Sequence, residues 1–205
     1  DPAPDPSAAA PRTPSAVTAT PRRPSTSTPL QASVLASSAV SRISYAVVVN
    51  SSTDGVDQVP GDGRCDTGAS LSDGTPVCSL RAALMEANAG AATGAIIFDL
   101  PADDPAYRED ARGGTWELAP TVPLPAVTAP TTIDGSTQAG TRCAVDGEPP
   151  APSVRVTAPG AAGLVIRAPD SVVRGIGISG EEVGIDVRAG GRLTLTCSRI
   201  GAVDP

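Results

Sequence analysis

The chain has 205 residues, and its composition excludes several kinds of chemistry. It contains no histidine, and all 15 basic residues are arginine against 22 acids, which gives a net charge of −7. The lack of histidine excludes Ser-His-Asp triads, Cys-His dyads and His-ligated zinc. The acidic balance disfavours nucleic acid as a partner, because phosphate binding depends on clustered Lys and Arg.

The first 42 residues have the composition of an unfolded stalk. They contain 8 Pro, 8 Ser, 5 Thr and 9 Ala, too little apolar bulk for burial to offset the entropy of ordering. We expect residues 1–42 to form a disordered Pro/Ala/Ser/Thr-rich stalk. The chain starts at Asp1, as expected either of a secreted protein whose signal peptide has been removed or of numbering inside a longer precursor. No apolar run is long enough for a transmembrane segment.

Four cysteines follow, and their spacing predicts disulfides. Cys65, Cys78, Cys143 and Cys197 have neither the CxxC nor the Cys/His spacing of a zinc site. Cys65 and Cys78 bracket a polar, turn-rich loop with few core residues, so we expect a disulfide between them. Cys143 and Cys197 then either form a second disulfide or remain two buried thiols. Disulfides imply an oxidising, extracellular or cell-surface setting.

One helix is predicted, over residues 79–89. Ser79 is a good N-cap and Gly90 a good stop. A helix of three turns is marginal alone in water, so its apolar face must cover other hydrophobic residues. That face consists of residues at i, i+3, i+4 and i+7: Leu80, Ala83, Leu84 and Ala87.

A series of motifs spans most of the chain after the stalk. In order, they are Val47-Val48-Val49-Asn50-Ser51-Ser52-Thr53-Asp54, Pro60-Gly61-Asp62-Gly63-Arg64-Cys65-Asp66, Cys78-Ser79-Leu80-Arg81-Ala82-Ala83, Glu86-Ala87-Asn88, Ile96-Ile97-Phe98-Asp99-Leu100-Pro101, Thr132-Ile133-Asp134-Gly135-Ser136-Thr137-Gln138-Ala139-Gly140 and Ile200-Gly201. The series resembles the N-terminal CSLREA domain of secreted or surface-displayed bacterial proteins. The resemblance implies a right-handed parallel β-helix. Ala82 replaces the namesake Glu, which removes the acid of a capping box.

A repeat gives a separate reason to expect that fold. The segment 163–168, Gly-Leu-Val-Ile-Arg-Ala, recurs 21 residues later as Gly-Ile-Asp-Val-Arg-Ala over 184–189. Short β-rich repeats of this size suit stacked coils of parallel strands. We therefore predict an all-β, right-handed parallel β-helix, a single-stranded solenoid with coils of about 21 residues. A β-sandwich is the rival fold, because its strands are equally short.

The repeat also predicts strands and domains. Strands are expected near residues 163–168, 171–178, 183–188 and 192–200. Three side chains should point inward: Val172, Ile176 and Ile178.

Residues 43–94 are predicted to form a CSLREA-like cap containing the helix and the disulfide loop, and residues 95–205 the first coils. No second cap follows, so we expect a β-helix truncated at Pro205, with an open end that self-associates.

Acidic residues around the first disulfide are candidate calcium ligands. Asp54, Asp57, Asp62 and Asp66 are closely spaced in a Gly- and Pro-rich loop, as calcium ligands often are. Their spacing matches no EF-hand, and solvated turn acids are the alternative. No other cofactor is expected.

No catalytic constellation is recognisable elsewhere. The acid pairs 103–104, 109–110 and 181–182 have the composition of solvated loops. The arginines at 155, 167, 174 and 188 lie on predicted strands and face either a groove, as in polysaccharide lyases, or the outer surface. The aromatic residues Tyr107 and Trp116 are isolated, which fits core or edge packing better than sugar stacking.

The residues of the capping motif have a structural role in this interpretation. We expect the helix to bond to exposed backbone of the first coil, where strand ends need partners. The motif consists of Ser79, Leu80, Arg81, Glu86 and Asn88.

Together these features predict a secreted or surface-exposed structural or adhesive protein without catalysis in this segment. It would present a repetitive surface to glycans or cell-surface components. The alternative is a polysaccharide-active enzyme, a lyase or a glycosidase, whose cleft lies on later coils. A non-functional truncated reading frame is the third option.

Overall fold

The structure is a computed structural model that describes residues 46–90, 94–111 and 113–201. Contacts between residues divide the chain into residues 1–39 and residues 40–205, and every described residue belongs to the second unit. The stalk predicted over residues 1–42 lies outside the described residues, and so do residues 202–205.

The described residues form one α-helix, one short 3-10 helix and twelve strands. In chain order they are β1 (Ala46–Val49), α1 (Leu80–Ala89), β2 (Ala95–Phe98), β3 (Tyr107–Arg108), β4 (Thr115–Leu118), β5 (Thr132–Asp134), η1 (Gly135–Thr137), β6 (Val154–Thr157), β7 (Ala162–Ile166), β8 (Ser171–Arg174), β9 (Ile176–Ser179), β10 (Val183–Val187), β11 (Leu193–Thr196) and β12 (Arg199–Ile200).

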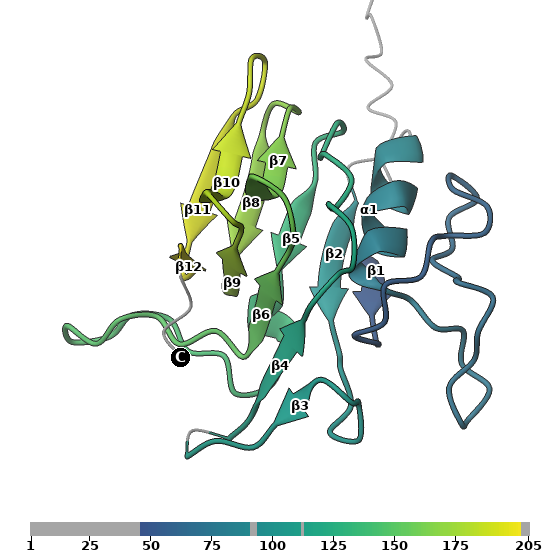
Figure 1. Cartoon of the computed structure of the whole chain (residues 1–205), viewed down its shortest axis with the longest axis horizontal. Coiled ribbons are helices and arrows are strands. Elements are labelled where there is room, and N and C mark those ends of the chain that lie inside the picture. The colour runs from purple at the N-terminus through teal and green to yellow at the C-terminus, as the bar shows by residue number, and fades with distance from the viewer. Residues whose placement is uncertain (1–45, 91–93, 112, 202–205) are drawn as a thin grey trace, which may run out of the picture. The chain divides into compact units, whose positions relative to one another are not determined.

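These strands pair into three separate sheets. The first sheet has the order β1-β2-β5-β8-β11, the second contains β10 and β7, and the third has the order β12-β9-β6-β4-β3. Pairing is parallel throughout, except between β3 and β4, which are antiparallel. Figure 1 shows α1 beside β1 and β2, and strands β10, β11 and β12 at the opposite end of the described structure.

The predicted fold class, a right-handed parallel β-helix built as a single-stranded solenoid, is wrong. The structure has three separate sheets with mixed parallel and antiparallel pairing. A regular repeat is limited to the later strands. The pairs β6–β9, β7–β10, β8–β11 and β9–β12 join residues 21 or 22 positions apart, whereas Thr132 pairs with Val172 and Ala46 pairs with Ala95, about 40 and 49 positions apart. The loops between the earlier strands differ too much in length to keep one period.

The strand predicted over residues 171–178 is two strands, and this break corrects one inward residue. Gly175, with φ +65°, separates β8 from β9 and resets the alternation of side chains. Val173, not Val172, is therefore the buried hydrophobic residue of β8, while Ile176 and Ile178 of β9 are buried as predicted.

Gly175 lies at a tight corner. A Cβ atom on Gly175 would collide with the backbone nitrogen of Ser136, so no larger residue fits there without a shift. Cys197 occupies the matching corner between β11 and β12, also with positive φ (55°). Non-glycine residues seldom adopt this conformation, and Cys197 is held in it by a disulfide to Cys143.

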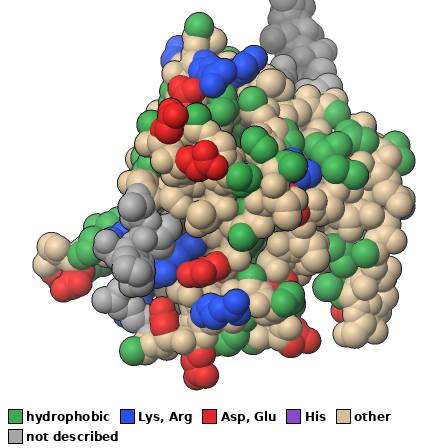
Figure 2. Space-filling model, in the orientation of Figure 1, with side chains coloured by type: hydrophobic (Ala, Val, Ile, Leu, Met, Phe, Trp, Pro, Cys, Tyr) green, Lys and Arg blue, Asp and Glu red, His purple; other side chains and the backbone are tan. Residues whose placement is uncertain are grey.

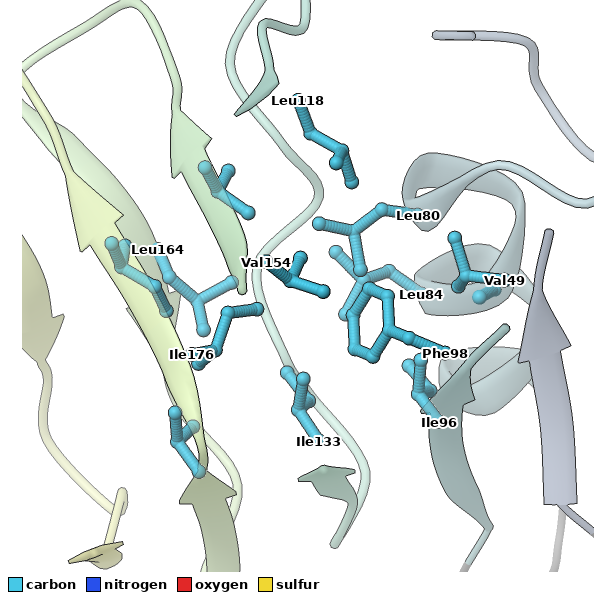
Figure 3. Packing of buried hydrophobic residues seen from close by; sticks show 14 of the residues in the cluster. Val49, Leu80, Leu84, Ile96, Phe98, Leu118, Ile133, Val154, Leu164 and Ile176 are labelled. Carbon is cyan, nitrogen blue, oxygen red and sulfur yellow. The ribbon is translucent and has the colours of Figure 1, made fainter. Parts of the chain in front are cut away.

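All three sheets and α1 contribute to one hydrophobic cluster. Figure 3 shows Leu80 and Leu84 of α1 pointing toward Phe98 of β2 and Val154 of β6. Phe98 is 1% exposed. The apolar face predicted for the helix thus covers the core next to β1 and β2, and this burial stabilises a helix too short to persist alone.

The ends of the helix agree closely with prediction. Ser79 is the N-cap, and its hydroxyl accepts a hydrogen bond from the backbone N–H of Ala82. Gly90 is the C-cap, and its N–H donates to the carbonyl of Glu86.

We expect Phe98→Ala to lower the free energy of unfolding by about 3–5 kcal/mol, because the truncation leaves a cavity among well-packed neighbours. Urea denaturation measures the change. Val56→Ala is the control, since Val56 is 58% exposed and should change stability by no more than about 0.5 kcal/mol. Equal effects of the two substitutions would contradict this description of the core.

Candidate functional site

Arg81 of α1 joins three segments of the chain. Its Nε donates to Oδ1 of Asp54 at 2.8 Å, and its Nη2 donates to Oδ2 at 3.1 Å. The same guanidinium donates to the carbonyls of Val122 and Pro123 at 2.7 and 3.0 Å. Asp54 also accepts from the backbone N–H and the hydroxyl of Thr121. Both charges are therefore paired and hydrogen-bonded, as a largely buried ion pair requires.

These contacts determine the ionisation of Asp54. Burial alone would raise the pKa of its carboxyl group, but the hydrogen bonds from Arg81 and Thr121 and the charge of Arg81 outweigh burial, and the pKa lies below its ordinary value. Asp54 is thus held as a carboxylate that anchors α1.

Glu86, one turn further along α1, holds a different loop. Its side chain is completely buried. Its Oε2 accepts from the N–H of Gly61 at 2.5 Å, and its Oε1 accepts from the N–H of Gly63 at 2.7 Å. Both glycines have positive φ, which presents two N–H groups of one turn to the same carboxylate.

The remaining polar residues of the motif also contact backbone. Asn88 donates from Nδ2 to the carbonyl of Ala126 and accepts from the N–H of Thr128. The hydroxyl of Ser79 donates to the carbonyl of Gly55. These contacts tie the helix to loop backbone at Gly55, Ala126 and Thr128, whereas the sequence analysis expected contacts to the first coil of a β-helix.

The predicted disulfide between Cys65 and Cys78 is present, and Cys143 and Cys197, whose state the sequence left open, also form a disulfide. None of the four cysteines is therefore a free thiol. Asn50 supports the first disulfide, because its side chain accepts from the N–H of Cys78 and donates to the carbonyl of Pro76. The two disulfides indicate a non-reducing, extracellular environment.

The four calcium candidates have separate surroundings. Asp54 bonds to Arg81, whereas Asp62 and Asp66 accept backbone N–H groups within their own turns, from Arg64 and Gly68. In the described ranges, no group of three or more His, Cys, Asp or Glu side chains is arranged to hold a metal ion.

Asp57 differs from the other three because it is buried, with 4% exposure. Its Oδ1 accepts from the N–H of Asp66 at 3.2 Å. Burial raises the pKa of Asp57, and the neighbouring Glu86 carboxylate raises it further through its charge and through side-chain hydrogen bonding. The structure therefore brings one predicted ligand, Asp57, next to a residue that was not among the candidates, Glu86.

Asp104 and the strand arginines Arg155, Arg174 and Arg188 have surface or structural partners. Asp104 accepts from the N–H of Ser52 and of Ala106, which fixes a loop. Arg174 lies 3.8 Å from Asp134, and Arg155 lies 3.9 Å from Glu117 across neighbouring strands. Exposed pairs of this kind contribute little stability.

The aromatic residues pack against each other. The rings of Tyr107 and Trp116 have centroids 5.0 Å apart, and Trp116 donates from its indole nitrogen to the carbonyl of Pro101. Trp116 is buried, so it does not provide an exposed platform for a sugar.

A core column is a row of paired side chains, on neighbouring strands, that point into the core. Three such columns include an exposed side chain at the end of the structure formed by β10, β11 and β12, which we call the β10–β12 end. In each column a fully buried residue pairs with an exposed one on the next strand. The pairs are Ile166 with Val187, Val173 with Leu195, and Ile178 with Ile200.

Ion pairs flank the β10–β12 end. Arg188 bonds to Asp186 at 2.7 Å, and Arg192 bonds to Asp170 at 2.6 Å. Figure 2 shows acidic and basic side chains close together where β10 and β11 lie. These four charged side chains pair with one another at the turn that joins β10 to β11.

Sequence reasoning missed the proximity of Asp57 and Glu86. A signal for Glu86 was present, because it follows Ala83 by three residues and so lies beside the apolar face of the helix. A Glu in that position must find partners inside the protein, since buried Glu is rare unless it is paired.

Within the described residues, none of the helical segments has the length and apolar character needed to cross a lipid bilayer.

We expect Arg81→Leu to lower the free energy of unfolding by about 3–5 kcal/mol, because Asp54 and two carbonyls lose their partner. Chemical denaturation measures the loss. Arg192→Leu is the matched control: both members of its ion pair are exposed, and its removal should cost at most about 1 kcal/mol. A small effect of Arg81→Leu would contradict the anchoring role.

The lowered pKa of Asp54 predicts a dependence on pH. The ionised carboxylate stabilises the fold in full above its unfolded pKa, near 3.8, and this contribution disappears as the pH falls through the lower folded pKa. Urea unfolding between about pH 5 and pH 2 should therefore show an acid-sensitive component that Arg81→Leu reduces. An unchanged profile in the variant would show that another group carries the effect.

No protein family, curated protein or solved structure matches this chain. The likeness to the CSLREA domain accordingly rests on the motifs alone.

Proposed function

We propose that this chain is a secreted or surface-exposed structural or adhesive protein that associates with a second copy of itself through the β10–β12 end. The observation that carries the proposal is the exposure of core columns at this end. Val187 is 46% exposed, Leu195 is 43% exposed and Ile200 is 38% exposed, although their partners on the preceding strands are buried.

The backbone at this end favours association as well. Among the described strands, β10, β11 and β12 each have a neighbour on one side only. An unpaired strand edge offers a row of N–H and C=O groups to another chain. Strand β11, with the sequence Leu-Thr-Leu-Thr, contains no charge or proline that would discourage such pairing.

The geometry favours contact between like ends. Helix α1 lies beside β1 and β2 (Figure 1), where its apolar residues pack into the core, whereas Val187, Leu195 and Ile200 are exposed at the β10–β12 end. Two copies that meet through the same surface form a two-fold, isologous interface, which is the commonest arrangement of homo-oligomers. Burying the exposed Val, Leu and Ile side chains would drive the association.

The outer faces of the sheets support the adhesive part of the proposal. Glu117 and Arg155 lie side by side on the third sheet, and Asp134 and Arg174 lie side by side on the first. Parallel register places such polar groups in rows with the spacing of neighbouring strands, about 4.8 Å. A rigid row of this kind suits extended, repetitive partners such as glycans or other cell-surface components.

Sedimentation velocity over a wide range of protein concentrations tests the association. We expect a reversible dimer of the wild-type chain, and we expect Leu195→Arg to weaken it about tenfold or more, because a charge would enter the apolar contact; tenfold corresponds to about 1.4 kcal/mol. Val56→Arg is the control, since Val56 is exposed on a loop in the N-terminal part of the described chain. A wild-type chain that stays monomeric at every concentration, or equal weakening by both substitutions, would contradict the proposal.

A further inference from the structure

The two disulfides differ in their exposure to solvent. Cys78 is 3% exposed, and its partner Cys65 is half-buried and packs against the hydrophobic cluster. Cys143, by contrast, is exposed, and its partner Cys197 is half-buried at the corner between β11 and β12. A reductant must reach a sulfur atom in order to attack it, so the Cys143–Cys197 disulfide is the more accessible of the two.

Cys143 is attached to the body of the protein independently of its disulfide. It belongs to hairpin 142–151, whose first and last residues exchange two backbone hydrogen bonds, of 3.0 and 2.9 Å. At the base of the hairpin, the hydroxyl of Thr141 donates to the carbonyl of Gly135 and accepts from the N–H of Ser153. The hairpin therefore offers a fixed attachment point for the cysteine on the other side of the disulfide.

The corner at Cys197 is otherwise held by a short strand and by long hydrogen bonds. Cys197 has φ 55°, a conformation that a non-glycine residue keeps only where its surroundings impose it. Strand β12, which follows it, has two residues and pairs with β9 alone. The N–H of Gly175 donates to the carbonyl of Thr196 at 3.2 Å, and the N–H of Ile176 donates to the hydroxyl of Ser198 at 3.3 Å. The disulfide is therefore a main constraint on this corner.

The corner belongs to the surface proposed for association. Leu195 precedes Cys197 by two residues, and Ile200 follows it by three. Both side chains are exposed, although their partners on the preceding strands are buried. A corner of fixed shape presents the two side chains ready for burial by a second copy, whereas a mobile corner must first be ordered, at a cost in entropy.

We propose that Cys143–Cys197 is a redox-sensitive disulfide that controls the self-association of this chain. The oxidised form holds the corner and supports association, and reduction releases the corner and weakens association. This inference rests on the association proposed above and adds its regulation. The Cys65–Cys78 disulfide stays closed under the same conditions, because Cys78 is buried. A reductant would therefore separate two copies while the loop beside α1 remains stapled.

The reductant is a dithiol, and the exchange has two steps. One thiolate of the dithiol attacks Sγ of the exposed Cys143, forms a mixed disulfide with it and releases Cys197 as a thiolate, which takes up a proton. The second thiol of the dithiol then attacks the mixed disulfide and releases Cys143, which is protonated in turn. Two electrons and two protons pass to the protein, and the dithiol becomes an intramolecular disulfide.

Alkylation of the native full chain with dithiothreitol as the dithiol tests the selectivity. Trypsin cleaves after arginine, so the two disulfides are read on different peptides: residues 65–81, 143–155 and 193–199. We expect Cys143 and Cys197 to become alkylated about tenfold faster than Cys65 and Cys78, or more. Equal rates, or faster opening of the Cys65–Cys78 disulfide, would overturn the proposal.

Hydrogen exchange shows whether the disulfide fixes the corner, and it does so without any association. In protein diluted until it is monomeric, the backbone amides of residues 193–200 should exchange about fivefold faster after selective reduction, or more, while those of α1 keep their protection. Unchanged exchange over residues 193–200 would contradict the role given to the disulfide.

Sedimentation velocity then measures association in both redox states. We expect the Kd of the dimer to rise about fivefold or more on reduction. The variant Cys143→Ser/Cys197→Ser should associate as weakly as the reduced chain and should not respond to the reductant, so it also controls for any effect at Cys65 and Cys78. A second variant, Cys143→Ser/Cys197→Gly, removes the bond but places at the corner a residue that adopts positive φ freely. We expect it to associate as weakly as the first, and association of wild-type strength would show that the bond is not needed.

The results separate failure of this inference from failure of the proposed association. A dimer whose Kd stays the same after Cys143–Cys197 has opened would overturn the redox control and leave the association standing. A wild-type chain that is monomeric in both redox states would refute the association and its control together. If either variant fails to fold, reduction of the wild-type chain still decides the question.

Discussion

Parallel register between strands that are distant in sequence is the constraint on which the described structure depends. In such a ladder, paired residues point to the same side, so one buried residue fixes the environment of its partners on neighbouring strands. Ile96, Ile133 and Val173 pair in this way on β2, β5 and β8, and all three are buried. The core is therefore built from columns, and the chain between paired strands is free to vary in length.

Side chains at the end of such a column are exposed to water unless another part of the protein covers them. The two ends of the described structure differ in this cover. At the β1–β2 end, α1 covers the core with Leu80 and Leu84 and is fixed by buried charges. Arg81 and Glu86 each have several directional partners, so they set the position of the helix more strictly than apolar contact would. At the β10–β12 end, Val187, Leu195 and Ile200 of these columns are exposed.

Local chemistry in the sequence was enough to predict the helix and the loop closed by Cys65 and Cys78. Ser79 and Gly90 act on their immediate neighbours, the apolar positions follow the 3.6-residue period, and Cys65 and Cys78 close a short loop. The sequence left open whether Cys143 pairs with Cys197, because 54 residues separate them and only the corner at Cys197 brings them together. A spacing of 21 or 22 residues holds for the strand pairs from β6 to β12, but it does not extend to the earlier strands.

The sequence by itself determined the local elements: the capped helix, the turn-rich loop between two cysteines and the short aliphatic strands near the C-terminal end. Only the tertiary structure decided how the strands group into three sheets, that Val173 and not Val172 enters the core, and that Asp57 meets Glu86 while Asp54 meets Arg81. The physical reason is the range of the interactions. Caps, periodicity and short loops act within one or two turns of the chain, whereas register and charge pairing depend on residues brought together from dozens of positions away.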